Sequence, residues 1–510
     1  MTTANDINAN LTLPDKVNSL RTTVKSLAKV ASDYDFQNVQ HNGIRSSIKV
    51  FDCFLRAYEE FNINSLKVNQ NLEQKLSDVS DLLMIMSEIL LDNLVGHSKL
   101  TYIDHLDILM SIPEQKLISL YSIGYFWLSD EQNEAIRKMS NYVALFTGDF
   151  KVLMDSEHAF RLKAKRTQDY NIMEFKRLAA TAEYSWINWI ARWRYPVDQC
   201  QQVNVETHSN FELQIDGSFF KKATTNIVEC QVIRFKSSPK FDGKVLYHAH
   251  GGGFAVAPPI VHQIYLRQIA RACPGLTIVT PHYGLAPERK YPAALQDMTD
   301  VYLHLSDPEL SKSMLGFVPE ELILFGDSAG GTLHLGMCHV LDELGFAIPE
   351  KMILCYASTG GSFSHFKPSA TLMIVDSMLS FGTLLNFSDG YAPGPMYNYH
   401  EDRTPFYKRS RDLFLSRIRE ISDHSSTDKF YNPMLGSHEL FKKTRLVNIA
   451  CEFDPLLDAA IVLAREWPVA DLCDLIIIEG MTHGFLGSST KEGCAATEHF
   501  IKKLQHLCEM

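Results

Sequence analysis

The stretch EELILFGDSAGGTLHLG, residues 320–336, contains the local pattern that decides the fold. An apolar run precedes the pentapeptide GDSAG at 326–330, and a helical pattern follows it. A residue on a tight turn between a strand and a helix has strained backbone angles, so the positions two before and two after it must be very small. Gly326 and Gly330 meet that requirement. We therefore predict that Ser328 follows a strand and that its hydroxyl is exposed at the rim of a sheet.

The chain around this turn alternates between short apolar runs and amphipathic helical segments from about residue 225 onward. The candidate strands, in chain order, are IVECQVIRF, KVLYHA, LTIVTP, LILFG, KMILCYA, RLVNIAC and CDLIIIEG. Strands that alternate with helices indicate a mostly parallel sheet that helices cover on both faces. The predicted fold class is therefore α/β.

The first 205 residues have a different texture, because their apolar residues recur at helical spacings. One such run is Phe51, Phe54, Leu55, Tyr58 and Phe61. We predict a helical N-terminal domain over 1–205 and an α/β domain over 206–510. Trp186, Trp189 and Trp193 share one helical face, which we expect to be buried in the core or at a domain interface.

A long irregular segment, 358–429, interrupts the alternation and is rich in Ser, Gly, Pro and aromatic residues. It holds one apolar amphipathic piece, residues 371–387. Because a connection of this length inside a compact domain usually has a function, we expect an insertion that acts as a lid. The alternative is a surface excursion that only packs on the fold.

The composition is that of a globular protein, with 45% hydrophobic and 21% charged residues. A net charge of −11 argues against a nucleic-acid partner. The polar N-terminal residues do not predict a secretory leader, and no run of apolar residues is long enough to predict a transmembrane span. The ten cysteines are scattered without a CxxC pair, which is typical of reduced thiols in the cytoplasm.

A serine hydroxyl needs a base to become nucleophilic, and in this arrangement the acid and the histidine follow the serine along the chain. Asp454 directly follows the strand RLVNIAC, and His483 lies in the loop after CDLIIIEG. Both therefore lie at the same sheet edge as Ser328. Asp454 is expected to orient His483, which takes the serine proton. Asp458, expected in the next helix, and Glu452, inside the strand end, are the competing acids.

The stretch HAHGGGFAVAP, residues 248–258, follows the strand KVLYHA. In acyl-transfer enzymes of this chain order such a loop donates backbone N–H groups to the oxyanion, beside the residue after the nucleophile. We predict Gly252, Gly253 and Ala329 as those donors. The residues expected to support these motifs are His250, Gly251, Gly326, Asp327 and Gly330.

Two other interpretations of the glycine loop are weaker. A phosphate-binding loop is disfavoured because neither GxGxxG nor GxxxxGK[ST] is present. A metal site built on His248 and His250 lacks a third ligand, so no metal and no cofactor is expected. His250 is instead expected to hydrogen-bond within the loop and to fix its shape.

Five motifs carry a family resemblance: HGGGF at 250–254, YGLAPERKYPAAL at 283–295, GDSAGG at 326–331, DPLLD at 454–458 and HGF at 483–485. Together they resemble the hormone-sensitive lipase family of α/β-hydrolases over about residues 240–505. The resemblance implies an α/β-hydrolase domain. It matches Ser328, Asp454 and His483 to the family triad, and it matches the three predicted amide donors to the family oxyanion hole.

The N-terminal half also resembles, more weakly, the helical domain of animal members through HNGIRSSIKVFDCFL, FWLSDEQNEAIRKM and YSWINWIARW. The resemblance implies hydrolysis of neutral lipid esters in intracellular lipolysis: diacylglycerol, triacylglycerol, monoacylglycerol, and sterol or retinyl esters. It also implies a cytoplasmic enzyme recruited to lipid droplets, with the droplet surface or a droplet protein as partner, and it includes a homodimer among the expected assemblies.

The chain departs from the vertebrate pattern in one place. Between Ser328 and Asp454 there are 126 positions (454 − 328), too few for the serine-rich regulatory module of vertebrate members. Two alternatives stay open: a carboxylesterase of small or aromatic esters, and a ligand receptor on the same fold. The receptors that resemble this family lack the catalytic histidine, whereas His483 is present here.

Overall fold

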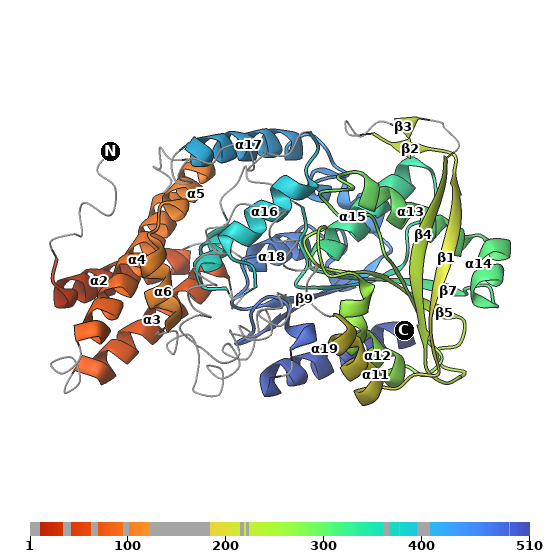
Figure 1. Cartoon of the computed structure of the whole chain (residues 1–510), viewed down its shortest axis with the longest axis horizontal. Helices are drawn as coiled ribbons and strands as arrows, with labels where there is room; N and C mark the ends of the chain where they lie inside the picture. The colour runs from red at the N-terminus through yellow and green to blue at the C-terminus, as the bar shows by residue number, and fades with distance from the viewer. Residues whose placement is uncertain are drawn as a thin grey trace.

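A central eight-stranded sheet organises the protein, and its strand order is β1-β4-β6-β5-β7-β8-β9-β10 (Figure 1). The computed structural model describes residues 11–33, 42–62, 70–94, 101–122, 184–214, 219–220, 224–360, 367–376, 378–394, 409–488 and 490–510. The strands of the sheet are β1 (Gln199–Ser209), β4 (Thr224–Arg234), β5 (Lys244–Ala249), β6 (Thr277–Pro281), β7 (Glu321–Asp327), β8 (Lys351–Cys355), β9 (Arg445–Cys451) and β10 (Cys473–Ile478). From β6 to β10 neighbouring strands are parallel, as predicted for an α/β fold.

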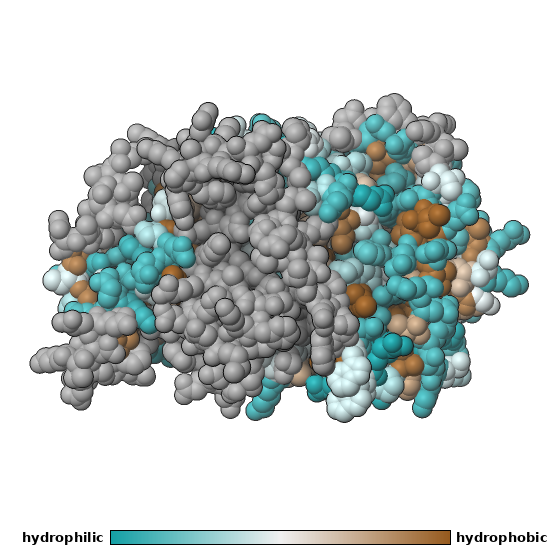
Figure 2. Space-filling view, in the orientation of Figure 1, coloured by the Kyte–Doolittle hydropathy of each residue, from teal (hydrophilic) through white to brown (hydrophobic). Residues whose placement is uncertain are grey.

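Strand β1 is the main strand that the sequence pattern does not predict. It pairs antiparallel with β4 along its whole length, and it spans the predicted domain boundary after residue 205. The side chains on the outward face of β1 are exposed and polar, so its sequence contains no apolar run that would predict a strand. Figure 2 shows hydrophilic residues with scattered apolar ones over this end of the sheet, where Ile227 of β4 is 66% exposed. A short hairpin, β2 (Glu212–Leu213) with β3 (Phe219–Phe220), lies beside it.

Helices cover both faces of the sheet because the strands alternate their apolar side chains between the two sides. In β5, Val245 and Tyr247 pack into the same core cluster as α13 and α15, whereas Leu246 packs into the cluster that holds α12 and α19. The helices of this domain are α12 (Pro259–Ala272), α13 (Ala293–Ser306), α14 (Pro308–Leu315), α15 (Ala329–Glu343), α18 (Leu457–Arg465) and α19 (Lys491–Glu509).

The N-terminal helices lie at one end of the molecule, beyond the carboxyl ends of the parallel strands (Figure 1). They are α2 (Leu13–Asp33), α3 (Gly43–Asn62), α4 (Gln70–Leu94), α5 (Tyr102–Met110) and α6 (Glu114–Ser122). The predicted helical patterns of this half are therefore confirmed where the structure describes them. Leu20, Phe54 and Leu82 are fully buried and belong to the core cluster that continues into the α/β domain. Among the described helices, none combines the length and hydropathy that a membrane crossing requires.

Part of the predicted lid is interior structure. The described elements of 358–429 are η2 (Pro368–Ile374), α16 (Phe381–Tyr391) and α17 (Arg409–Ser425), while 361–366, Ser377 and 395–408 lie outside the described residues. All seven residues of η2 are buried, and η2 packs beside α3. This piece is therefore not a surface flap, because its apolar side chains face other elements instead of solvent.

The expected burial of the tryptophan stripe is wrong for two of its members. In α11 (Tyr184–Arg194), Trp189 is 58% exposed and Trp193 is 73% exposed, and their rings stack with centroids 6.3 Å apart. The helix turns Ala191 inward instead, and α11 packs against α12. Helical spacing shows that side chains share a face, but it does not show which face the neighbouring elements cover. The side chain of Trp186 lies outside the described residues.

Candidate active site

Ser328 sits on the predicted turn, between the end of β7 and the first residue of α15. Its backbone angles are φ 52° and ψ −121°, a strained conformation that costs roughly 1–3 kcal/mol. Backbone hydrogen bonds hold it: the Ser328 amide donates to Cys355 O at 3.1 Å, and its carbonyl accepts from the Ser358 amide at 2.9 Å and from the Gly331 amide at 3.1 Å. A Cβ on Gly326 would lie 2.8 Å from the Gly330 carbonyl, so the turn closes only with glycine there.

The structure brings the three predicted triad residues together in one hydrogen-bonded chain. Ser328 Oγ lies 2.9 Å from His483 Nε2, and His483 Nδ1 lies 2.8 Å from Asp454 Oδ2. Asp454 Oδ1 also accepts the Leu456 amide at 2.8 Å, which fixes the carboxylate. Because the carboxylate can only accept, Nδ1 carries the proton and Nε2 is free to take the one from Ser328.

His483 is buried among carboxylates, and its pKa is raised above its ordinary value. Burial alone would lower the pKa of His483, but the charge of Asp454 and its hydrogen bond raise it, with further contributions from Asp376 and Asp327. Asp376 is the residue that the sequence analysis missed: its Oδ2 accepts the His483 amide at 3.3 Å. It lies in the irregular segment predicted as a lid, where no local pattern marks it.

The glycine loop after β5 lies beside Ser328, because a Cβ on Gly251 would lie 3.0 Å from Ser328 Cβ. Gly252 has φ 110° and Gly253 has φ 59°, angles that side chains rarely adopt. A Cβ on Gly252 would overlap the Val256 carbonyl, and a Cβ on Gly253 would overlap the ring of Phe387. Within the described part of the chain, the amides of Gly252, Gly253 and Ala329 donate to no other protein group, so all three are available to an oxyanion.

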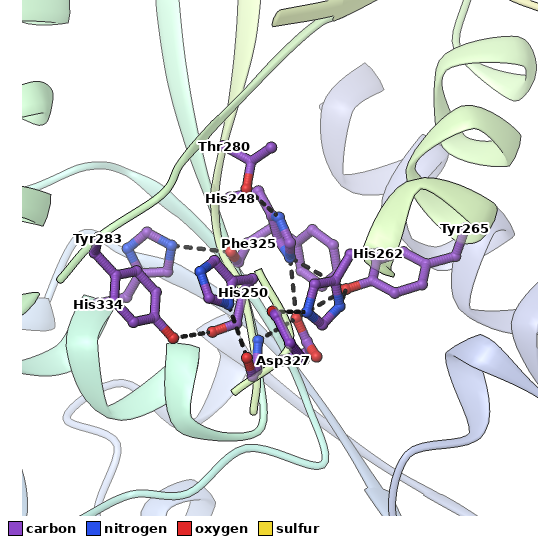
Figure 3. A network of polar contacts seen from close by, with 11 residues as sticks. His248, His250, His262, Tyr265, Thr280, Tyr283, Phe325, Asp327 and His334 are labelled. Atoms are coloured by element: carbon purple, nitrogen blue, oxygen red, sulfur yellow. Dashed lines mark hydrogen bonds and ion pairs between the residues drawn. The ribbon is translucent and has the colours of Figure 1, made fainter. Parts of the chain in front are cut away.

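Asp327, next to the nucleophile, anchors this loop to the turn (Figure 3). Its Oδ1 accepts the Gly251 amide at 3.1 Å, the Tyr265 hydroxyl at 3.0 Å and His248 Nε2 at 3.0 Å. Burial raises the pKa of Asp327, but His262 and His248 outweigh burial and hold it at about 2. Asp327 is therefore a carboxylate that connects the predicted oxyanion loop rigidly to the strand that ends at Ser328.

His250 has the local role predicted for it. Its Nδ1 donates to Gly251 O at 2.8 Å, and its ring stacks on Tyr283 with centroids 4.0 Å apart (Figure 3). The Tyr283 hydroxyl donates to His250 O at 2.7 Å. Burial lowers the pKa of His250 well below its ordinary value, so the ring is neutral. Among the described residues, no three or more metal-ligating side chains gather in one group.

The two competing acids have other partners. Asp458 Oδ1 accepts the Gly43 amide at 2.8 Å, and its Oδ2 accepts the Ser369 amide at 2.7 Å. Glu452 Oε2 accepts the Gly480 amide at 2.9 Å, and its other oxygen pairs with Lys49. Both carboxylates therefore bind segments around the site, and Asp454 is the acid that contacts the histidine.

Comparisons with known proteins agree with this fold. Residues 246–487 match the family model described as alpha/beta hydrolase fold. The chain is 27% identical to ethyl acetate hydrolase of Pseudomonas putida, over 53% of this chain and 75% of that enzyme. It is 30% identical to hormone-sensitive lipase of Bos taurus over 31% of this chain and only 20% of the lipase. The solved esterase of the archaeon Pyrobaculum calidifontis is 18% identical, with a TM-score of 0.50, over 68% of this chain and 98% of the esterase.

The fold agrees with that model: residues 246–487 match an alpha/beta hydrolase fold, and Ser328, His483 and Asp454 form one hydrogen-bonded chain within this region. Within that superfamily the relatives found include ester hydrolases and hormone-sensitive lipases. The predicted fold class is confirmed. The similarity supports the wider family around hormone-sensitive lipase and does not single out that lipase itself.

Proposed function

We propose that the protein hydrolyses carboxylic esters through an acyl-enzyme intermediate. The observation that carries the proposal is the chain of Ser328 Oγ, His483 and Asp454, at 2.9 and 2.8 Å, beside the unpartnered amides of the glycine loop. Ser328 Oγ attacks the ester carbon while His483 Nε2 takes its proton. The amides of Gly252, Gly253 and Ala329 stabilise the oxyanion, each contributing roughly 3 kcal/mol to lowering the barrier.

The second half of the cycle uses the same groups. His483 returns the proton to the departing alkoxide, and the acyl group stays on Ser328. A water molecule then attacks the acyl carbon while His483 again takes a proton, and the carboxylic acid leaves. Asp454 holds the imidazole orientation in both halves and stabilises the imidazolium.

Short-chain or aromatic esters are the proposed substrates. The ring of Phe387, on α16, packs directly against Gly253, and Phe254 stacks on Tyr391 with centroids 3.9 Å apart. These contacts bring α16 close over the glycine loop, which favours acyl groups of limited bulk. The ethyl acetate hydrolase also aligns over more of both chains than the hormone-sensitive lipases do. This carboxylesterase was the alternative in the sequence analysis, and it is now the better supported one.

Neutral lipid esters are the second candidate. The similarity to hormone-sensitive lipase of Bos taurus, 30% identity over 160 residues, favours them. The helical N-terminal half is a further argument, because animal members of that family also carry one. Hydrolysis of acylglycerols, sterol esters or retinyl esters and recruitment to lipid droplets belong to this candidate alone. A pure receptor role is disfavoured, because a receptor needs no hydrogen-bonded triad.

A substrate panel with Ser328→Ala tests the proposal. We expect wild type to hydrolyse p-nitrophenyl acetate and butyrate faster than the palmitate or a diolein emulsion, and a fluorophosphonate probe to label Ser328. Ser328→Ala should lose labelling and reduce kcat by about 10⁴-fold or more, because the triad acts as a unit. Ser306→Ala, whose hydroxyl donates to Tyr302 O at 2.9 Å within α13, is the control.

Two results would contradict parts of the proposal. Ester turnover that survives Ser328→Ala would show that another group is the nucleophile. Faster turnover of diolein than of the short esters would move the assignment to the neutral-lipid candidate.

A further inference from the structure

The start of helix α3 contacts the loop that carries the catalytic acid. The Gly43 amide donates to Asp458 Oδ1 at 2.8 Å, and Ser46 Oγ donates to Glu452 O at 2.6 Å. One turn further along, the ammonium of Lys49 pairs with the carboxylate of Glu452. These contacts bracket Asp454 on both sides in sequence, although α3 precedes the acid by some four hundred residues. The contacting residues of α3 belong to the stretch HNGIRSSIK, to which the proposed ester hydrolysis assigns no role.

Element η2 also contacts the loop that carries Asp454. The Ser369 amide donates to Asp458 Oδ2 at 2.7 Å, and Ser369 Oγ donates to Pro455 O at 2.8 Å. The side chains of Ser47 in α3 and Thr371 in η2 lie 3.1 Å apart, within hydrogen-bond distance. A Cβ at Gly43 would overlap the Ser369 amide, so the close approach of α3 and η2 requires glycine there.

The same segment continues to the catalytic base. Two residues beyond η2, Asp376 accepts the His483 amide at 3.3 Å on Oδ2, and its Oδ1 accepts the Met378 amide at 2.7 Å. The hydroxyl of Tyr121, in α6, donates to Ile374 O at 3.2 Å and ties the end of η2 to the N-terminal helices. Hydrogen bonds therefore connect the N-terminal helices to the loop that carries Asp454 and, through the segment after η2, to His483.

We propose that Gly43, Ser46 and Asp458 are positioning residues for the triad, so that the N-terminal helices are part of the active-site support. Their contacts hold the loop 452–458 at both ends and keep the Asp454 carboxylate against His483 Nδ1. This inference rests on the proposed ester hydrolysis, because it concerns the efficiency of the same triad. A buried polar contact that served only to join two parts of the molecule would change stability without changing the chemistry at His483.

The test compares two buried serines of the N-terminal helices. Ser46→Ala removes the hydroxyl that donates to Glu452 O, whereas Ser80→Ala removes one that donates to Leu76 O, at 2.9 Å, within α4. We expect Ser46→Ala to lower kcat for p-nitrophenyl acetate about tenfold, with KM changed less than about twofold, since the lost hydrogen bond leaves the acid loop less firmly held. Ser80→Ala should lower Tm by about as much as Ser46→Ala does and should keep the wild-type kcat.

The pH dependence of inactivation is a second measurement, because a residue that contributes only to packing would not change it. Asp454, Asp376 and Asp327 all raise the pKa of His483, and Ser46→Ala is expected to weaken only the contribution of Asp454. The acid limb of fluorophosphonate inactivation should therefore shift to lower pH in Ser46→Ala and stay in place in Ser80→Ala. In Asp458→Asn only one side-chain oxygen remains for the Gly43 and Ser369 amides, so the acid limb should also shift to lower pH.

Equal Tm losses with unchanged kcat and unchanged pH profiles in both serine variants would overturn the inference. If wild type itself shows neither ester turnover nor labelling, the proposed function fails and the inference is judged by amide hydrogen exchange. The Leu456 amide donates to Asp454 Oδ1, so its exchange reports the position of the acid. It should speed up in Ser46→Ala and not in Ser80→Ala, and equal exchange in the two variants would also overturn the inference.

Discussion

His483 lies between three carboxylates of unequal importance. Asp454 is in direct contact with the ring at 2.8 Å, Asp376 binds the backbone amide at 3.3 Å, and Asp327 acts through its charge. All three favour the imidazolium, so they outweigh burial and raise the pKa of His483. In the proposed mechanism the general base must be neutral to act, so we expect ester hydrolysis to fall as the pH drops through this raised pKa.

The first prediction concerns this pH dependence. The acid limb of kcat/KM for wild type is expected at a midpoint above 6.5, the ordinary value for histidine. Asp454→Asn should move the midpoint down and lower kcat by about 10⁴-fold, because the largest stabiliser of the imidazolium is lost. Asp474→Asn, on the exposed end of β10, is the control and should leave both values unchanged. A wild-type midpoint at or below 6.5 would contradict this account.

Chain order and loop position were enough to predict which three side chains the structure brings together in one hydrogen-bonded chain. Ser328, Asp454 and His483 each follow a recognisable apolar strand, and the carboxyl ends of parallel strands meet at one edge. Asp376 could not be found in this way. It follows a buried 3-10 segment instead of a strand, and only tertiary packing brings it to the His483 amide.

Among the elements, helix α13 meets strand β1 through a buried carboxyl group. Ser209 Oγ donates to Asp300, and Gln296 Nε2 donates to the same oxygen at 2.9 Å. Burial raises the pKa of Asp300 to about 6. The folded state therefore favours the protonated carboxyl, and its relative stability is lost as the pH rises through about 6.

A neutral side chain at position 300 should remove the free-energy cost of burying a charged carboxylate there. Asp300→Asn is expected to raise Tm by a few degrees at pH 7.5, because the amide carries no charge to desolvate. The gain should shrink as the pH is lowered through about 6 and vanish near pH 4, where the native carboxyl is protonated in the folded protein. Thermal unfolding across this pH range measures the effect, with the exposed Asp342→Asn as control. A gain that does not depend on pH would exclude the electrostatic cause.

Helices and strands with a clear pattern of apolar residues in the sequence were predicted well. Elements that depend on contacts with distant parts of the chain were not. Strands β5 and β9 coincide with their predicted runs, KVLYHA and RLVNIAC. Strand β1 is polar on its exposed side and exists because β4 pairs with it. Element η2 looked like part of a surface lid, because nothing local shows that α3 covers it.

For the molecule as a whole, the N-terminal helices and the α/β domain share one hydrophobic core. Phe54 of α3 and Leu333 of α15 belong to the same cluster of buried side chains. The polar contacts at Gly43, Ser46 and Asp458 cross the same boundary. The two predicted domains are therefore expected to unfold together and not one after the other.

Calorimetry checks this expectation. Wild type should give a single endotherm, and Phe54→Ala should shift the whole transition downward, because it leaves a cavity at a fully buried site that costs about 3–5 kcal/mol. Two endotherms, of which only the first responds to Phe54→Ala, would show that the N-terminal helices unfold independently.

Residue order alone determined the α/β architecture, the strained turn at Ser328, the glycine loop and the order of the triad, because each depends on periodicity or on steric demands within a few residues. Tertiary structure decided the rest. It exposed Trp189 and Trp193, and it placed Asp376 beside His483. It also brought Ser46 of α3 to the acid loop, a contact between distant parts of the chain that only packing can create.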